Sequence, residues 1–484
     1  MHHTTTHRRV PAVCLLLSAL LAGGIAHGKT VDTLNDPKLA MTVDARAYPV
    51  RIVDMLVAAA RDSKKNAGWS AMLDGLAENQ LMAKHAVREV GREKLLVADR
   101  VGFAPEILRE EQLISIIRMN FRKELEAYVR SRPGGTLKDL ISWQIPANDP
   151  ALKELTTLRD IGEVRLTPAQ RELARKTTVA ILTFPDRTKR NVSFEDIYVH
   201  MNVQGRVRVL QDRELAFLDA QIKSRAEALF ITWWAEARSG LSVREIALLK
   251  NLLEEKQLRE SYLVRRGVMS AIHEDTPEYL LDLQKKVTKP EILAWYEKHK
   301  EEFRQVEKVK ARHIRCATEA ACNAAKAAID KGMEFSAAAK KFSVAADKSG
   351  TPAGSLGWIM RETKDLPWLH QVALIQKKGQ MTPPIRTPED ASGNAAWEIV
   401  LVDERVEGYS APDSETVAYQ ARQEIAKKKA LEAYRDLRAS LLDAADIRRN
   451  GALLKARSRP EDDTSDELEA MQHADDGHGH GHGH

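Results

Sequence analysis

Histidine is the residue type through which this sequence could carry out acid–base or metal chemistry. His313 lies in the run KVKARHIRC, which predicts a β-strand that starts near Val309. An imidazole titrates near neutral pH and can donate or accept a hydrogen bond, so His313 could act on a bound substrate. Taken alone, the same residue is better explained as a core histidine that holds two strands together.

A second group of histidines lies at the C-terminal end, in GHGHGHGH. These residues are His478, His480, His482 and His484. Imidazoles on a glycine-rich chain can bind Ni, Cu or Zn ions, although a purification tag or a solvated tail has the same composition. The spacing does not match a metal site with fixed ligand positions, so we expect metal affinity without a catalytic metal, and no required cofactor.

Other classes of function find no support. The sequence contains no G-x-S-x-G, H-E-x-x-H or Walker-type motif, which argues against hydrolase and nucleotide chemistry. The net charge of +5 comes from 74 basic and 69 acidic residues, without a basic stripe interleaved with aromatic residues. We therefore expect no nucleic acid among the partners.

The N-terminus predicts an exported protein. Arg8 and Arg9 precede an apolar run over residues 10–21, and small residues follow as far as Gly28. This order is typical of a cleavable signal peptide, which we place at residues 1–28, and it predicts a periplasmic location. The alternative is a retained signal that anchors the protein, and only in that case do we expect membrane contact. Cys14 lies inside the run, which argues against a lipoprotein.

Cleavage would leave Cys316 and Cys322 as the remaining cysteines. An oxidising compartment would allow them to form a disulfide. They could instead be two small core residues.

The organisation of the chain predicts an α+β protein. Residues 29–305 are helix-rich, residues 306–408 have mixed periodicity, residues 409–450 predict one long helix, and residues 451–484 form a charged tail that we expect to be disordered. The late helix, opened by Pro412, Asp413 and Ser414, carries an apolar stripe and must pack on another element. We expect it to pack on the early helical region, so that the mixed domain is an insert in one helical framework.

The helix-rich region contains a degenerate repeat. Val43–Leu56 and Ile181–Ile197 each predict two short strands around a turn and then a helix, with Ser193 as an N-cap. Each unit precedes an amphipathic helix, beginning near Leu73 and near Leu218. Residues 131–150, rich in Pro and Gly, predict a linker or insertion between the units.

Two adjacent tryptophans lie in the second of these amphipathic helices. Trp233 and Trp234 could line a groove that binds an extended client. Its helical periodicity instead favours Trp233 in the core and Trp234 at the surface.

The mixed segment resembles the parvulin (PpiC-like) family of peptidyl-prolyl cis/trans isomerases. EILAWYEKHKEEFRQVEKVKARHI resembles the entry helix and first strand, GMEFSAAAKKFS the first helix junctions, GSLGW the GDLGW turn, and GQMTPPIRT the strand after the last helix. The flanking helical regions are similar in organisation to the SurA/PpiD class of exported chaperones. The resemblance implies an antiparallel sheet with helices of the split βαβ type, and catalysed rotation about X–Pro bonds in unfolded or nascent exported polypeptides.

The resemblance also implies site residues. His313 matches the first-strand histidine of the family, and Asp347 matches the acidic or cysteine position before the glycine loop. Without an apparent two-residue insertion, that position would be Ala345 and the acid would be missing. Glu398 stands where the family has a second histidine, and Ser355 where it usually has aspartate.

For the proline pocket, the resemblance implies four substrate-binding residues: Leu366, Trp368, Leu369 and Met381. A His–Glu pair could still hydrogen-bond but would not reproduce a neutral relay between two histidines, and the glutamate would raise the basicity of His313. Three functions therefore follow as hypotheses. The chain is an active isomerase and chaperone for exported proteins, or a non-catalytic holdase with a degenerate parvulin domain. The third hypothesis is a metal-binding maturation factor that uses the histidine tail.

Overall fold

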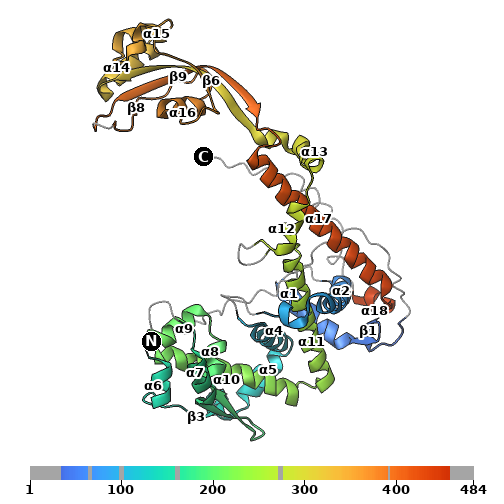
Figure 1. Cartoon of the computed structure of the whole chain (residues 1–484). Coiled ribbons are helices and arrows are strands. Elements are labelled where there is room, and N and C mark those ends of the chain that lie inside the picture. Colours follow the sequence, from blue (N-terminus) through green and yellow to red (C-terminus); the bar gives the residue numbers. More distant parts are fainter. Residues whose placement is uncertain are drawn as a thin grey trace. The chain divides into compact units, whose positions relative to one another are not determined.

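The computed structural model describes residues 34–63, 68–97, 103–157, 164–270, 276–390 and 393–457. These residues form two compact units (Figure 1). The first unit contains the residues up to Tyr279 and those from Ala430 onward, and the second contains Leu280–Lys429. Within the described ranges, every helix is too short or too polar to cross a lipid bilayer. The expected signal peptide, residues 1–28, lies outside these ranges.

The first unit is mainly helical and carries two small antiparallel sheets, ordered β10-β1-β2 and β3-β4-β5. Its strands are β1 (Leu39–Val43), β2 (Arg46–Pro49), β3 (Ile141–Gln144), β4 (Thr178–Thr183), β5 (Lys189–Ser193) and β10 (Ile447–Arg449). Its helices are α1 (Val50–Ser63), α2 (Trp69–Val90), α3 (Arg92–Leu95), α4 (Pro105–Asn120), α5 (Arg122–Arg130), α6 (Pro150–Leu155), α7 (Pro168–Lys176), α8 (Phe194–Val199), α9 (Val203–Leu210), α10 (Leu215–Arg238), α11 (Val243–Arg265), the second half of α17 (Glu415–Ala444) and α18 (Gly451–Arg457).

The predicted repeat is present in the first unit. The hairpin β1–β2 leads into α1, and the hairpin β4–β5 leads into α8. Ser193 caps α8 as expected, because its hydroxyl accepts a hydrogen bond from the Asp196 amide while the Asp196 side chain returns to the Ser193 amide. The long helices α2 and α10 follow the two hairpins, and their apolar faces contribute to one shared core.

The stretch 131–150, predicted as a linker or insertion, contains β3, which extends the β4–β5 hairpin because its backbone pairs with β4. Two other expectations for this unit were wrong. The positions of the tryptophans are reversed: Trp234 is buried, whereas Trp233 is half-buried and its indole N–H donates to Asp186 at 2.9 Å.

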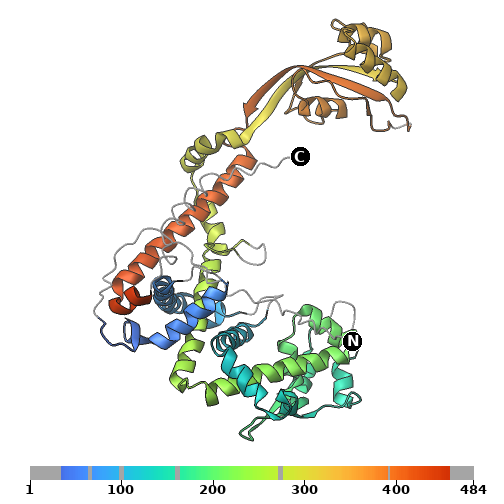
Figure 2. The same ribbon diagram turned by 180° about the vertical axis from the view of Figure 1, so that it is seen from behind.

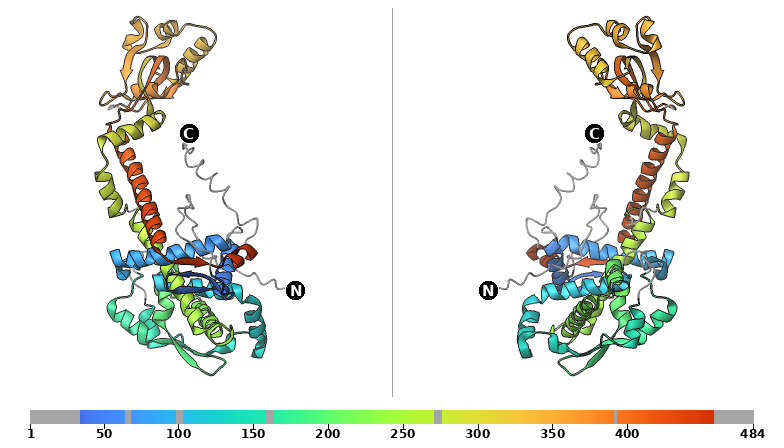
Figure 3. Two further views of the ribbon diagram at one scale, coloured as in Figure 1. Left: turned by 90° about the vertical axis from the view of Figure 1, so that its right-hand side faces the viewer. Right: turned by 90° about the vertical axis from the view of Figure 1, so that its left-hand side faces the viewer.

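The tail also begins later than expected. β10 pairs with β1, as Figure 3 shows for the red strand beside the blue hairpin, and α18 follows it. Asn450 caps α18 by accepting a hydrogen bond from the Leu453 amide at 3.1 Å, and Leu453 and Leu454 pack against the core. Residues 451–457 are therefore ordered, contrary to the expected boundary of the tail.

The second unit contains a four-stranded antiparallel sheet ordered β7-β6-β9-β8. Its strands are β6 (Arg304–Cys316), β7 (Ser355–Met360), β8 (Ile385–Arg386) and β9 (Trp397–Tyr409), and its helices are α12 (Glu278–Lys285), α13 (Lys289–His299), α14 (Glu319–Asp330), α15 (Phe335–Phe342), α16 (Trp368–Ile375) and the first half of α17. Helices α14 and α15 cover one face of the sheet and α16 covers the other (Figures 1 and 2).

Side chains cap several helices of the second unit. Thr288 forms a capping box at the start of α13, and Thr318 caps α14. Glu334 caps α15, because its carboxylate accepts a hydrogen bond from the Ala337 amide at 3.0 Å. The hydroxyl of Ser336 accepts a hydrogen bond from the Arg312 guanidinium.

A buried carboxylate fastens the second half of α17 within the first unit. Glu78 on α2 accepts hydrogen bonds from Arg259 at 2.8 Å, from Arg438 at 2.7 Å, and from the hydroxyl of Tyr434. Burial opposes the charge of Glu78, but the charge of Arg259 and the other donors outweigh it, and the pKa of Glu78 lies below its usual value. The cluster therefore joins α2, α11 and α17 through one charged group.

We predict that Glu78→Ala destabilises the first unit by about 3 kcal/mol, because it leaves the buried Arg259 without its counter-charge. Urea unfolding followed by circular dichroism measures the effect. Glu126→Ala is the matched control, since it removes a carboxylate from an exposed i,i+4 pair with Arg122, and we expect no measurable change from it. Equal stability of the two variants would contradict the prediction.

Candidate active site

The pairing of β6 with β9 places His313 beside Glu398. His313 lies opposite Val400 and Glu398 lies opposite Arg315, so the two side chains are diagonal neighbours on the same face of the sheet. Nδ1 of His313 is 2.7 Å from Oε2 of Glu398. Both side chains are buried, with 7% and 3% of their surface exposed.

The loop before β7 brings Asp347 to the other side of the imidazole ring. Nε2 of His313 is 2.7 Å from Oδ2 of Asp347. The backbone of the loop is fixed to β6, because the Gly354 amide donates to the Asp347 carbonyl at 3.0 Å and the His313 amide donates to the Gly354 carbonyl at 2.8 Å. Asp347, and not Ala345, therefore takes the acidic position.

Gly354 is required where the loop meets β6. Its φ of +71° lies in the left-handed region, and a Cβ at this position would overlap the carbonyl oxygen of His313. Ser355, at the position where aspartate was expected, makes a local turn in which its hydroxyl accepts from the Gly357 amide at 3.3 Å.

His313 lies between two carboxylates, and both of its ring nitrogens can donate to them at once only when the ring is an imidazolium. Burial opposes its charge, but the hydrogen bonds and charges of Glu398 and then Asp347 outweigh burial and raise the pKa of His313 above 6.5. Nε of Arg315 lies 3.6 Å from the second oxygen of Glu398. This arrangement differs from a pair of histidines that share a proton.

The expected proline-pocket residues divide between the two faces of the sheet. Leu366 and Leu369 pack against the apolar cluster under α16, which includes Val400, the residue opposite His313. Trp368 is half-buried at the start of α16. Met381 instead packs against the cluster under α14 and α15. The structure thus brings Leu366 and Leu369, but not Met381, to the face that carries His313.

Sequence reasoning missed His370 and gave no role to Thr382. Burial, together with the charge of His313, lowers the pKa of His370. The buried Thr382 makes two hydrogen bonds to the backbone of Val400 in β9. The Thr382 amide donates to the Val400 carbonyl, and the Thr382 hydroxyl accepts from the Val400 amide, both at 2.9 Å. The position of His370 in the first turn of α16, after Pro367, is the signal that could have drawn attention to it.

Cys316 at the end of β6 and Cys322 in α14 form a disulfide, with their Cα atoms 5.5 Å apart. This resolves the alternative left open by the sequence. The expected metal ligands in the tail, His478 to His484, lie outside the described residues. Among the residues that the structure describes, no group of three or more His, Cys, Asp or Glu side chains could hold a metal ion.

We predict that His313 titrates above pH 6.5 in the folded protein and that Glu398→Gln lowers its pKa, because an amide does not attract the imidazolium. Ring ¹⁵N NMR measures both values. His370 serves as an internal control, since its pKa lies below 6.5 and should rise when His313 loses charge. A His313 pKa at or below 6.5 in the unsubstituted protein would contradict this arrangement.

Because the pKa of His313 is raised in the folded state, protonation of His313 stabilises the folded protein. The contribution of His313 to the free energy of unfolding is fully present below about pH 6.5 and is lost as the pH rises through the folded-state value.

We predict that Gly354→Ala displaces the loop that carries Asp347 and destabilises the second unit. Positive φ costs alanine about 1 kcal/mol, and the overlap with His313 adds roughly 1–3 kcal/mol. Gly379→Ala is the matched control, because Gly379 also has a positive φ but has open space around its Cβ position. Thermal unfolding of both full-length variants tests this, and equal shifts would show that Gly354 makes no close contact.

The second unit matches a known family of domains. The family model described as the PPIC-type PPIase domain matches residues 287–417. A search of curated proteins found no match.

Solved structures of foldases and chaperones align with the chain at low identity. They include a peptidylprolyl isomerase (PrsA) from Bacillus anthracis, with 18% identity, coverage of 46% of this chain and 84% of that chain, and a TM-score of 0.19. They also include a Campylobacter jejuni structure described as one of two SurA-like chaperones, PEB4 and Cj1289, with 18% identity, coverage of 49% and 85%, and a TM-score of 0.19. PrsA from Bacillus subtilis aligns at 16% identity, with coverage of 60% of this chain and 96% of that chain, and a TM-score of 0.18. At such TM-scores the likeness is too slight to assign an activity.

The family match, the antiparallel sheet flanked by helices on both faces, and the position of His313 on the first strand of that sheet agree with one another. Residues 287–417 of this chain are a parvulin-type, PPIC-type peptidyl-prolyl isomerase domain.

Proposed function

We propose that this protein is an exported foldase that catalyses cis/trans isomerisation of X–Pro bonds in unfolded client polypeptides and also holds those clients. The observation that carries the proposal is the position of His313, whose two ring nitrogens lie 2.7 Å from Glu398 and Asp347, on the sheet face that also carries Leu366 and Leu369. A fixed polar cluster beside an apolar surface suits a prolyl amide, which has an apolar ring and a polar carbonyl.

The reaction needs no covalent step. Rotation about the X–Pro bond has a barrier of about 18–20 kcal/mol, because the planar amide must lose its conjugation, and it takes tens of seconds without a catalyst. Only contacts that favour the twisted amide over the planar one accelerate rotation. The task of the site is therefore to hold the ring and to stabilise the twisted state.

Each residue has a proposed role. Leu366 and Leu369 bind the proline ring through apolar contact. His313, Asp347 and Glu398 supply charges whose positions are fixed before the substrate arrives, so little reorganisation is needed as the amide twists. Asp347 is the member of the cluster nearest to solvent, with 34% of its side chain exposed, and we assign to it the contact with the client.

Export and client type form part of the proposal. A signal-like N-terminus and a disulfide between Cys316 and Cys322 both support an oxidising compartment such as the periplasm. The clients would be recognised by an extended backbone and an X–Pro bond.

One observation favours a second candidate, a holdase without catalysis. Glu398 stands where the family pattern has a second histidine, and its carboxylate favours the charged form of His313, which differs from a neutral pair of histidines that exchange a proton. In that case the domain would bind prolyl segments without accelerating their rotation.

We predict that the full-length protein accelerates isomerisation of a proline-containing peptide in a protease-coupled assay. Asp347→Asn should reduce kcat/KM at least tenfold, because it removes a charge that pairs with His313. Leu369→Ala should mainly raise KM, because it removes apolar contact with the ring. Circular dichroism of each variant verifies folding.

Lys326→Gln is the control, since it breaks an exposed i,i+4 pair on α14 and should leave the rate unchanged. A full-length protein that gives no rate above background but still suppresses aggregation of a denatured client would overturn the catalytic proposal in favour of the holdase.

A further inference from the structure

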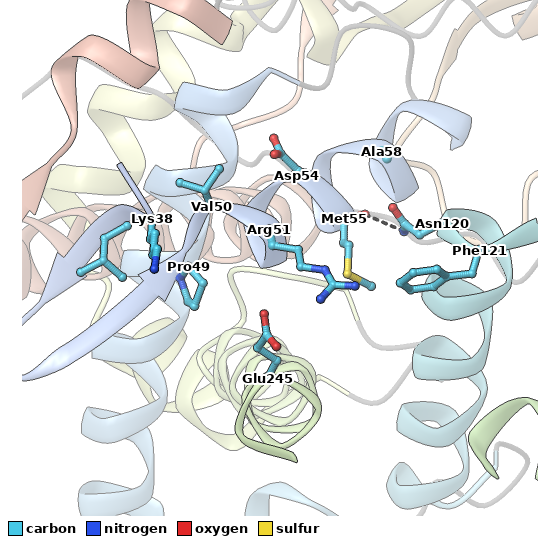
Figure 4. A pocket seen from close by; sticks show the side chains of 11 residues that line it. Lys38, Pro49, Val50, Arg51, Asp54, Met55, Ala58, Asn120, Phe121 and Glu245 are labelled. Atoms are coloured by element: carbon cyan, nitrogen blue, oxygen red, sulfur yellow. Dashed lines mark hydrogen bonds between the residues drawn. The ribbon is translucent and has the colours of Figure 1, made fainter. Parts of the chain in front are cut away.

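The first unit contains a pocket of about 790 Å³ that the isomerase chemistry does not use (Figure 4). Its apolar wall comes mainly from the β1–β2 hairpin, α1 and the end of α4, and includes Leu39, Pro49, Val50, Met55 and Phe121. Asn120 fixes α4 against α1, because its amide donates to the carbonyls of Met55 at 3.0 Å and Ile116 at 2.9 Å. The volume lies in the range of binding pockets in proteins.

A second pocket, of about 340 Å³, continues from the first along α1. The two pockets share Asp54 and Ala58. The second is also lined by Arg61, Trp69 and Arg457. Together they form one groove, which we call the α1 groove.

The α1 groove has an excess of positive charge. Its basic residues are Lys38, Arg51, Arg61 and Arg457, and its acidic residues are Asp54 and Glu245.

Both acids already have partners within the first unit. Asp54 accepts two hydrogen bonds from Arg457, at 2.9 and 2.7 Å, and the Glu245 carboxylate caps α11 through Ser242. The exposed Lys38 ammonium, in contrast, makes no hydrogen bond or ion pair with any residue that the structure describes. The groove therefore suits an acidic segment with some apolar side chains.

Such a segment follows directly in the sequence. Arg457, the last described residue, lines the groove itself. After it comes SRPEDDTSDELEAM, with acidic residues from Glu461 to Glu469 and with Leu468 and Met471 as apolar residues. An extended residue spans about 3.3 Å, and a helical residue rises about 1.5 Å, so this segment is long enough to run back along α1 toward Lys38.

We propose that residues 458–471 of the same chain bind in the α1 groove, with their carboxylates against Lys38 and with Leu468 or Met471 against the apolar wall. The chain leaves the described structure inside the groove, and this short connection gives the segment a high effective concentration there.

Zero-length carbodiimide cross-linking of the full-length protein tests this proposal, because the reagent joins a carboxylate to a lysine only when they are in contact. We expect Lys38 to be linked to carboxylates between Glu461 and Glu469 at least fivefold more than Lys153, an exposed lysine of the same unit that lies outside the groove. The product should migrate as a monomer, and its yield should fall in 1 M salt because screening weakens the ion pairs.

Matched variants separate the contributions. Substituting Glu461, Asp462 and Asp463 by their amides should lower the Lys38 product at least fivefold, whereas Asp475→Asn with Asp476→Asn should leave it unchanged. Leu468→Asp should lower the yield without removing any carboxylate, which distinguishes groove binding from charge attraction alone. Equal labelling of Lys38 and Lys153, or a Lys38 product found only in a dimer band, would overturn the proposal, the latter by showing that a second copy occupies the groove.

Discussion

The antiparallel pairing of β6 with β9 is the constraint on which the candidate site depends. It fixes the register that makes His313 and Glu398 diagonal neighbours, and it provides the backbone groups to which the Gly354 loop and Thr382 attach. A shift of one residue in this register would turn Glu398 to the opposite face of the sheet. The chemistry of the site is thus set by backbone hydrogen bonds that lie on either side of it.

Charge is used in the same way in both units. Glu78 holds two guanidinium groups in the first unit, and His313 is held by two carboxylates in the second. In each case a buried ion is tolerated because several hydrogen bonds replace its hydration. The two clusters differ in their exposure to solvent. Glu78 is enclosed by helices, whereas the side chain of Asp347 is partly exposed, so that a ligand can reach it.

The sequence was sufficient to predict the local elements and part of the site. The strand carrying His313, the hairpins and most helix caps follow from nearby residues. The choice of Asp347 over Ala345 does not follow from nearby residues. The two alternatives differ only in how the loop is anchored, and the anchor is a long-range backbone contact through Gly354. The face taken by Trp234, the side reached by Met381 and the existence of β10 likewise depend on partners distant in the chain.

The composition of the first unit has a consequence for biosynthesis. Its three-stranded sheet receives β10 from residues 447–449, after the whole second unit has been made. When the chain emerges from its N-terminus, one edge of β1 therefore stays unpaired until residues 447–449 have emerged, whereas Leu280–Lys429 is already available as a continuous stretch. Early folding of that stretch would bring the two halves of its host closer together and shorten the loop that the last strand must close.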